Sequence, residues 1–146
     1  MNVYVASSWR NTFQPSVVEA LRKAGFYVYD FRHPKPGDDG FSWAQIDPYW
    51  QEWTPEGFRR ALEHEVAQAG FKSDMDALKL CDACVLVLPC GRSAHLEAGW
   101  AAGAGKKVLV FMPQKEEPEL MYLMNGLRGN VYTTLNGIIE RLKDLA

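Results

Sequence analysis

The sequence predicts an α/β fold: a doubly wound, flavodoxin-like or Rossmann-like parallel sheet of about five strands flanked by helices. Short apolar runs alternate with longer stretches at helical spacing, and parallel strands need such crossover connections. One run, residues 83–88, is apolar without interruption, which is typical of a central strand covered on both faces. The 146 residues are 47% hydrophobic, and a domain of that size can bury a sizeable core.

The first elements follow from short-range patterns. A strand, a polar loop, a helix and a second strand are expected in that order at residues 3–6, 7–11, 15–24 and 26–31. The helix carries an apolar stripe at helical spacing and meets Gly25, which offers a stop. The second strand is rich in aromatic residues and valine, which favour strands.

A long aromatic loop follows at residues 32–54. It shows no sustained periodicity, yet it carries three of the five tryptophans. Loops of this length are commonly functional, so we treat it as an insertion in a single domain spanning residues 1–146 and as a lid over the end of the sheet. Trp43 is a candidate to stack on a nucleobase, and the alternative is that this tryptophan and its neighbours form a small aromatic core.

The second half of the chain continues the alternation. Helices are expected at 55–69, ending before Gly70, and at 73–80. The central strand leads through a turn to Ser93, a candidate N-cap. The remaining elements are a helix, a strand, a short helix, a strand and a helix at residues 94–104, 108–112, 117–124, 130–132 and 134–145.

Charge and composition favour a small-molecule ligand. The net charge of −2 and the pI near 5.9 provide no basic surface for a nucleic-acid polymer. No apolar run approaches the roughly 20 residues that span a bilayer, and no basic leader begins the chain, so we expect a cytoplasmic protein. Cys81, Cys84 and Cys90 are interpreted as reduced structural thiols, and neither a metal nor a cofactor is expected.

Parallel sheets bind ligands beyond the carboxyl ends of their strands. Two polar segments are predicted there: one after the first strand and one where the central strand turns into a helix. The helix N-terminus in the second segment favours an anion or sugar hydroxyls. The candidate binding residues are Ser7, Ser8, Trp9, Arg10, Gly91, Arg92 and Ser93.

Carboxylates are the candidate catalytic groups. Glu97 lies one turn beyond Ser93, near a helix N-terminus that favours the ionised form a nucleophile needs. Asp74 and Asp76 lie in the helix before the central strand, and either could supply the acid. Two carboxylates that flank one bond are the usual equipment for cleavage at an anomeric carbon; the alternative is that both aspartates only stabilise the first turn of their helix.

These residues resemble the nucleoside 2-deoxyribosyltransferase-like proteins, a set that includes deoxynucleotide and CMP N-glycosidases. The resemblance covers most of the chain. It rests on residues 3–7, on Asp74 eight residues before Asp82, on the segment 91–99 with its Glu-x-Gly core, and on residues 101–108. It implies that Glu97 is the nucleophile, Asp74 the acid and Tyr4 the residue that orients the nucleophile. It also implies a homodimer or larger homo-oligomer in which the region of Met124 and Asn125 completes a neighbouring site.

One departure leaves the reaction open. Gly91 stands six residues before Glu97, where transferases of this set often carry an acid and nucleotide hydrolases tend to carry a serine. The sequence therefore leaves open whether the reaction is transfer or hydrolysis, and whether the substrate is a nucleoside or a nucleotide. The alternatives are a nucleotide-sensing module without turnover and an NAD glycohydrolase of the Toll/interleukin-receptor type, which also uses a glutamate on an α/β fold.

Overall fold

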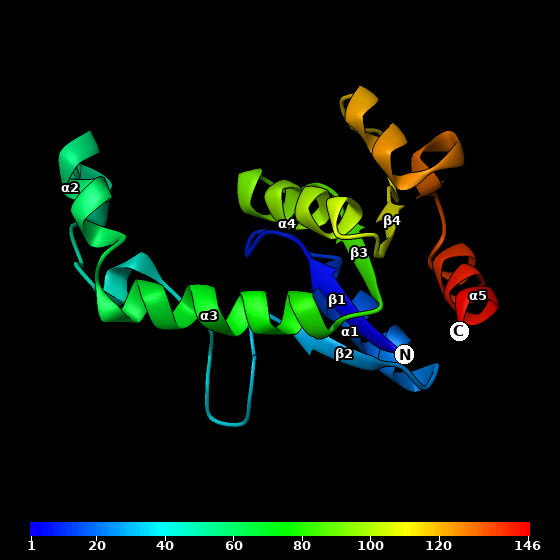
Figure 1. The fold of residues 1–146 in the computed structure, drawn as a ribbon, viewed down its shortest axis with the longest axis horizontal. Helices are drawn as coiled ribbons and strands as arrows, with labels where there is room; N and C mark the ends of the chain where they lie inside the picture. The colour runs from blue at the N-terminus through cyan, green and yellow to red at the C-terminus, as the bar shows by residue number, and fades with distance from the viewer. The chain divides into compact units, whose positions relative to one another are not determined.

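The computed structural model describes residues 1–146, which fold as two compact units. The sheet unit comprises residues 1–30 and 78–146, and the aromatic unit comprises residues 31–77. Figure 1 shows the strands in the sheet unit and the α2 helix with its flanking loops in the aromatic unit. That the chain forms a single domain with an insertion at 32–54 stays a prediction.

The sheet unit contains a five-stranded, entirely parallel sheet, which confirms the predicted fold class. Its strands lie in the order β2-β1-β3-β4-β5, so the chain winds outward in both directions from the β1–β3 pair. All five residues of β3 are buried, as expected for the central strand. The strands are β1 (Asn2–Ala6), β2 (Tyr27–Asp30), β3 (Ala83–Val87), β4 (Lys107–Phe111) and β5 (Val131–Tyr132).

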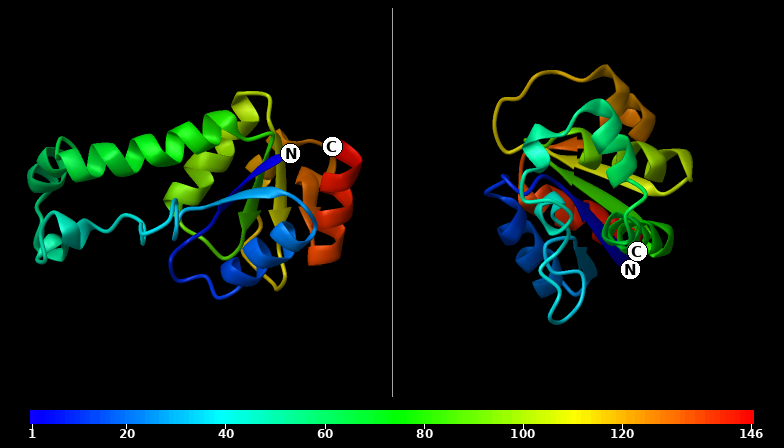
Figure 2. Two further views of the ribbon diagram at one scale, coloured as in Figure 1. Left: turned by 90° about the horizontal axis from the view of Figure 1, so that it is seen from below. Right: turned by 90° about the vertical axis from the view of Figure 1, so that its left-hand side faces the viewer.

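Helices cover both faces of this sheet (Figure 1, Figure 2). On one face, α1 (Gln14–Lys23) and α5 (Leu135–Leu145) pack their apolar stripes on alternate strand residues. On the other, α4 (Arg92–Gly103) buries a row of three alanines. Because side chains alternate across a strand, Val3 and Val5 enter the first core, whereas Tyr4 faces the α4 side. The small α4 residues let that helix approach the sheet closely.

The break between the two helices of the aromatic unit was predicted at the wrong place. The helix α2 (Pro55–Ala61) ends early, and α3 (Glu65–Leu80) runs through Gly70 without interruption. His64 Nδ1 accepts the Val66 N–H at 3.0 Å and so caps the start of α3. Gly70 fits in mid-helix because of packing: an added Cβ would lie only 3.1–3.2 Å from atoms of the Phe41 side chain.

Two other helix boundaries also differ from the sequence prediction. Gly91, not Ser93, is the N-cap of α4, and Ser93 lies inside the first turn. The expected helix at 117–124 is a shorter 3-10 segment, η3 (Leu120–Asn125). A residue before proline avoids helical geometry, so Pro118 keeps its predecessor out of a helix, and the Glu119 side chain caps the Met121 N–H at 2.7 Å.

Aromatic side chains form the centre of the aromatic unit. Trp43 packs edge-to-face against three rings, with centroids 4.7 Å from Phe41, 5.7 Å from Trp53 and 5.9 Å from Phe58. Such edge-to-face pairs add stability beyond the area they bury. The predicted aromatic core therefore exists for Trp43 and Trp53, around the short turns η1 (Trp43–Gln45) and η2 (Trp50–Glu52).

Candidate active site

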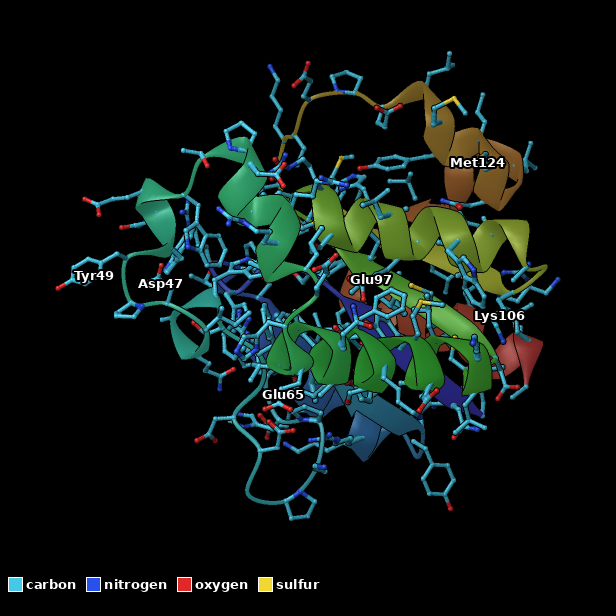
Figure 3. The ribbon with its side chains drawn as sticks, turned by 60° about the vertical axis from the view of Figure 1, so that its left-hand side comes forward. Asp47, Tyr49, Glu65, Glu97, Lys106 and Met124 are labelled. Atoms are coloured by element: carbon cyan, nitrogen blue, oxygen red, sulfur yellow. The ribbon has the colours of Figure 1, made fainter.

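The Tyr4 hydroxyl donates a hydrogen bond to the Glu97 carboxylate and so joins two predicted catalytic residues. The two residues are 93 positions apart in the chain. Tyr4 lies on β1 and is fully buried, and its ring stacks on Tyr29 with centroids 5.2 Å apart. Glu97 lies on the side of α4 that faces the sheet (Figure 3). The pair therefore lies at the β1–β3 switch point, where doubly wound folds place their ligands.

Burial dominates the electrostatics of Glu97. It raises the pKa of this carboxyl from 4.5 to about 7, because a charged group loses hydration in a partly apolar site. The sequence-based expectation that the helix N-terminus favours the ionised form was wrong. Glu97 is the sixth residue of α4, and the helix dipole falls off beyond the first turn. The Tyr4 hydroxyl is the group that favours the ionised form here.

Two loops beside this pair are joined by hydrogen bonds. Ser7 donates its hydroxyl to the Val87 carbonyl at 2.9 Å, and Ser8 Oγ accepts the Gly91 N–H at 2.9 Å. Asn11 donates to the carbonyl of Pro89 at 3.0 Å. The Ser7 hydroxyl thus has a structural partner, and its predicted contact with a substrate stays a prediction.

Asn11 is a positioning residue that sequence reasoning did not single out. Its amide nitrogen reaches both Val87 and Pro89, while its side-chain oxygen accepts the N–H groups of Phe13 and Gln14. One side chain therefore fixes the turn after β3 and also caps the start of α1. An asparagine between a strand and a helix is the signal that could have indicated this cap.

The exposed polar groups at this edge are available to a ligand. Arg10 is exposed after β1, and Arg92 and Ser93 are exposed in the first turn of α4. None of these three side chains has a hydrogen bond or an ion pair in the structure. Trp9, in the same loop as Arg10, is 51% exposed. The predicted binding residues after β1 and β3 thus offer positive charge, a hydroxyl and an aromatic face.

His95 links α4 to the η3 segment. Its Nδ1–H donates to the Gly91 carbonyl at 2.8 Å, since a carbonyl can only accept, and its Nε2 therefore accepts the Tyr122 hydroxyl at 2.9 Å. The two rings also stack, with centroids 5.8 Å apart. Burial is the first cause that raises the pKa of Tyr122 to about 12. This link holds the segment that carries Met124 and Asn125 against the helix of Glu97.

Asn125 is the last residue of η3 and is held by hydrogen bonds to the turn that follows. Its side-chain amide donates to the Gly129 carbonyl at 3.2 Å, and its own carbonyl accepts a hydrogen bond from the Asn130 side chain. Met124, beside it, is 55% exposed. Other apolar side chains of η3 are exposed as well, among them Leu120, Met121 and Leu123.

Three other predicted residues belong to the aromatic unit. Trp43 lies in its core, Asp74 is half-buried on α3, and Asp76 is exposed and pairs with Lys72. The ion pair gives Asp76 a structural partner one turn away on the same helix face. The contacts of the sheet unit therefore bring Tyr4 and Glu97 together, and the catalytic roles of the two aspartates stay predictions.

Three further findings concern the thiols, metal binding and the helices. Cys81, Cys84 and Cys90 are free thiols, as the sequence predicts; Cys81 and Cys84 are buried, whereas Cys90 is half-buried. Desolvation by burial raises the pKa of all three. No three histidine, cysteine, aspartate or glutamate side chains are grouped so that they could hold a metal ion. None of the helices combines the length and the apolar character needed to cross a membrane.

Comparison with known proteins identifies the fold. No family model matches the sequence, and no curated protein matches it significantly. Among solved structures, a 2-deoxyribosyltransferase from Bacillus psychrosaccharolyticus is 20% identical with a TM-score of 0.60, over 95% of this chain and 90% of that one. The chain has the 2-deoxyribosyltransferase fold.

Two further structures share this fold. The Clostridium botulinum CMP N-glycosidase is 20% identical, with a TM-score of 0.54 over 100% of both chains. A conserved protein from Enterococcus faecalis is 13% identical, with a TM-score of 0.58 over 100% of this chain and 99% of that one. The 2-deoxyribosyltransferase fold is thus found in proteins described as a transferase and as an N-glycosidase.

Proposed function

We propose that this protein cleaves or exchanges the N-glycosidic bond of a nucleoside or nucleotide through a covalent intermediate on Glu97. The observation that carries the proposal is the Tyr4–Glu97 hydrogen bond at the switch point of the sheet. The described activities of two proteins with the same fold, a 2-deoxyribosyltransferase and a CMP N-glycosidase, support the choice of reaction.

The proposed chemistry has two steps. The ionised Glu97 attacks C1′ of the sugar, the C1′–N bond breaks, and the base leaves with a proton donated by Asp74 or Asp76. A water molecule or a second base then attacks C1′ and returns a proton to the aspartate, which releases the Glu97 carboxylate and gives hydrolysis or exchange. Tyr4 holds the attacking oxygen in place and stabilises its charge.

The polar edge beside this pair suggests a polar or anionic substrate group. Arg10, Arg92 and Ser93 have no partner within the protein, and the N-terminus of α4 favours negative charge. These residues support recognition of sugar hydroxyls or of a 5′-phosphate.

We also propose that the protein forms homo-oligomers. Five side chains of the η3 segment and the turn after it are 55–86% exposed although they are apolar: Leu120, Met121, Leu123, Met124 and Leu127. Exposed apolar side chains concentrated within eight consecutive residues support an interaction site in this segment. Sedimentation should show a dimer or larger species for the native chain and a monomer for Leu123→Glu; a monomeric native chain contradicts the proposal.

A substrate panel tests the reaction. Deoxynucleosides, ribonucleosides, nucleoside monophosphates and NAD are incubated with the protein, and free base is followed by chromatography. We expect base release from at least one member and its loss in Glu97→Gln, with activity retained in Glu140→Gln, a change of an exposed glutamate on α5. Intact-mass analysis should find a sugar adduct on the native chain alone.

The outcomes separate the alternatives. Full activity in Glu97→Gln, or no base release from any member, contradicts the proposal. Tight binding of an unchanged nucleotide would favour the sensing module, and nicotinamide release would favour the NAD glycohydrolase. Comparison of Asp74→Asn with Asp76→Asn identifies the acid, because only its loss should slow release of the base.

A further inference from the structure

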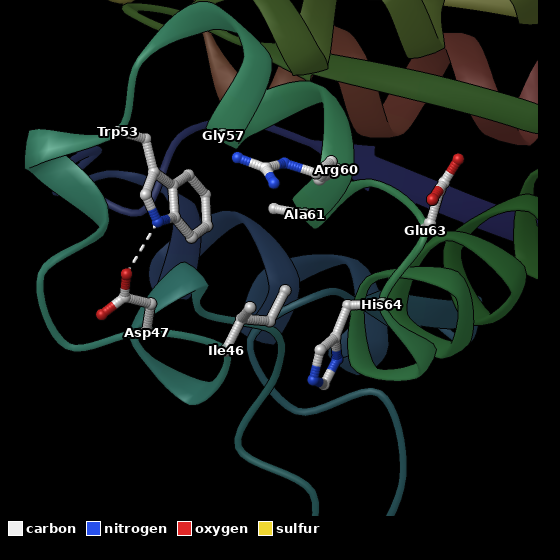
Figure 4. Close-up of a pocket in the computed structure, with 8 residues that line it drawn as sticks. All are labelled: Ile46, Asp47, Trp53, Gly57, Arg60, Ala61, Glu63 and His64. Atoms are coloured by element: carbon white, nitrogen blue, oxygen red, sulfur yellow. Dashed lines mark hydrogen bonds between the residues drawn. The ribbon is translucent and has the colours of Figure 1, made fainter.

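The aromatic unit contains a pocket of about 430 Å³ that lies entirely within residues 46–64. Its size falls in the range of small-molecule sites. The residues that line it are Ile46, Asp47, Trp53, Gly57, Arg60, Ala61, Glu63 and His64 (Figure 4).

One wall of the pocket is a fixed aromatic ring. The Trp53 indole N–H donates to Asp47 Oδ2 at 2.8 Å, and the Trp43 ring packs edge-to-face against the same indole. Asp47 is itself fixed, because its Oδ1 accepts the Tyr49 N–H at 2.8 Å. The indole is thus held in one orientation before any ligand binds, which lowers the entropic cost of stacking a ring on it.

The unused polar groups of the pocket are donors. Arg60 has no hydrogen bond or ion pair in the structure, and it lines the same pocket as Trp53 (Figure 4). His64 Nδ1 accepts the Val66 N–H, so the neutral ring carries its proton on Nε2, which is free to donate.

Two carboxylates, Asp47 and Glu63, also line the pocket and keep their negative charge, but neither forms an ion pair with Arg60. Both oxygens of Asp47 already accept hydrogen bonds, and Glu63 points away from the space between the other side chains (Figure 4). Ile46 and Ala61 add apolar surface without any polar atom. The pocket thus combines a flat apolar wall and two carboxylates with an unpaired guanidinium and an N–H donor.

We propose that this pocket binds a small planar anion, a molecule in which an aromatic or heteroaromatic ring carries a carboxylate or a phosphate. The ring stacks on Trp53, and the anionic group pairs with the Arg60 guanidinium and accepts the His64 Nε2–H. Arginine suits this role because its planar fork binds carboxylate and phosphate oxygens in pairs.

The test follows the Trp53 indole N–H by NMR in the full-length protein, with its signal assigned from Trp53→Phe. Quinoline-2-carboxylate is titrated against its neutral carboxamide, and CMP is added in a separate arm to the Glu97→Gln variant, which prevents turnover. We expect saturable shifts of this signal with an anion and weaker binding of the carboxamide by about tenfold. Carboxylate and phosphate ligands are distinguished by which arm binds more tightly.

A neighbouring arginine supplies the control. Arg60→Gln should weaken binding about tenfold, the loss of one charged hydrogen-bonding group. Arg59→Gln should change binding less than twofold, because Arg59 pairs with Glu56 at 3.2 Å and does not line the pocket. The proposal is overturned if neither anion shifts the Trp53 signal, if carboxylate and carboxamide bind equally, or if the two arginine variants weaken binding equally. None of these readouts depends on base release, so they leave the proposed reaction untouched.

Discussion

Replacing Glu97 by glutamine should stabilise the protein at neutral and alkaline pH. Burial raises the pKa of this carboxyl from 4.5 to about 7 in the folded state, so between these pH values the folded protein binds more protons than the unfolded chain. Stability must then fall as the pH rises through that window. Below pH 4.5 the group is protonated in both states and the effect vanishes.

The magnitude follows from the size of the pKa change. A rise of about 2.5, at about 1.4 kcal/mol for each pKa unit, gives about 3 kcal/mol of lost stability once the pH exceeds 7. Glutamine has nearly the same shape, carries no charge, and can accept the Tyr4 hydroxyl through its amide oxygen. Glu97→Gln should therefore match the native protein near pH 4.5 and exceed its stability by up to about 3 kcal/mol at pH 8.5.

Urea unfolding followed by circular dichroism at a series of pH values measures this difference. Glu140→Gln removes an exposed carboxylate from α5 and serves as the control, with a stability that follows the native protein at every pH. The reasoning is refuted if the native protein and Glu97→Gln keep a constant difference from pH 4.5 to pH 8.5.

Three further changes test other parts of the structure. Tyr4→Phe removes the hydroxyl that favours ionised Glu97. The rate of base release should rise with pH as Glu97 ionises, and in this variant that rise should occur about one pH unit higher. A rise at the same pH in both proteins would contradict the role of Tyr4. Lys106→Met removes two donated hydrogen bonds, to the carbonyls of Lys79 at 2.8 Å and Cys81 at 2.7 Å. It should lower the free energy of unfolding in urea by about 2 kcal/mol. A loss as small as that caused by Lys107→Met, a change of an exposed lysine, would show that these bonds contribute nothing. Gly70→Ala should not give the stability gain of about 1 kcal/mol that this change usually gives inside a helix, because the new methyl group meets Phe41. Gly99→Ala should give that gain, because the space around its Cβ position is open. Equal gains in the two variants would contradict the packing argument.

Local patterns were sufficient to predict the sheet. An uninterrupted apolar run predicted β3 as the central strand, and the alternation of strands and helices predicted the parallel pairing. These signals are strong because a strand covered on both faces tolerates apolar residues only. Local patterns could not predict the role of Lys106, which caps the end of α3, because the carbonyls that it contacts lie 25 and 27 residues earlier in the chain.

The helix boundaries were harder to predict because contacts distant in sequence decide them. Gly70 suggested a helix end, yet it lies in mid-helix against Phe41, 29 residues earlier. Ser93 had the character of an N-cap, but the Gly91 N–H is satisfied by Ser8 from another loop. Each error arose where a residue with a strong local preference was used for a contact that the local sequence does not reveal.

The Tyr4–Glu97 pair shows how much of the site a sequence can provide. The resemblance to a known family indicated both residues, but the ionisation of Glu97 depends on burial that only the fold supplies. With a pKa of about 7, about half of the molecules carry the ionised group at neutral pH. The donor from Tyr4 opposes that burial, so the balance between one hydroxyl and the surrounding apolar surface sets the fraction of protein that is ready to attack. A change that adds a second donor near Glu97 should raise the activity at pH 6 more than at pH 8, where the ionised form already prevails.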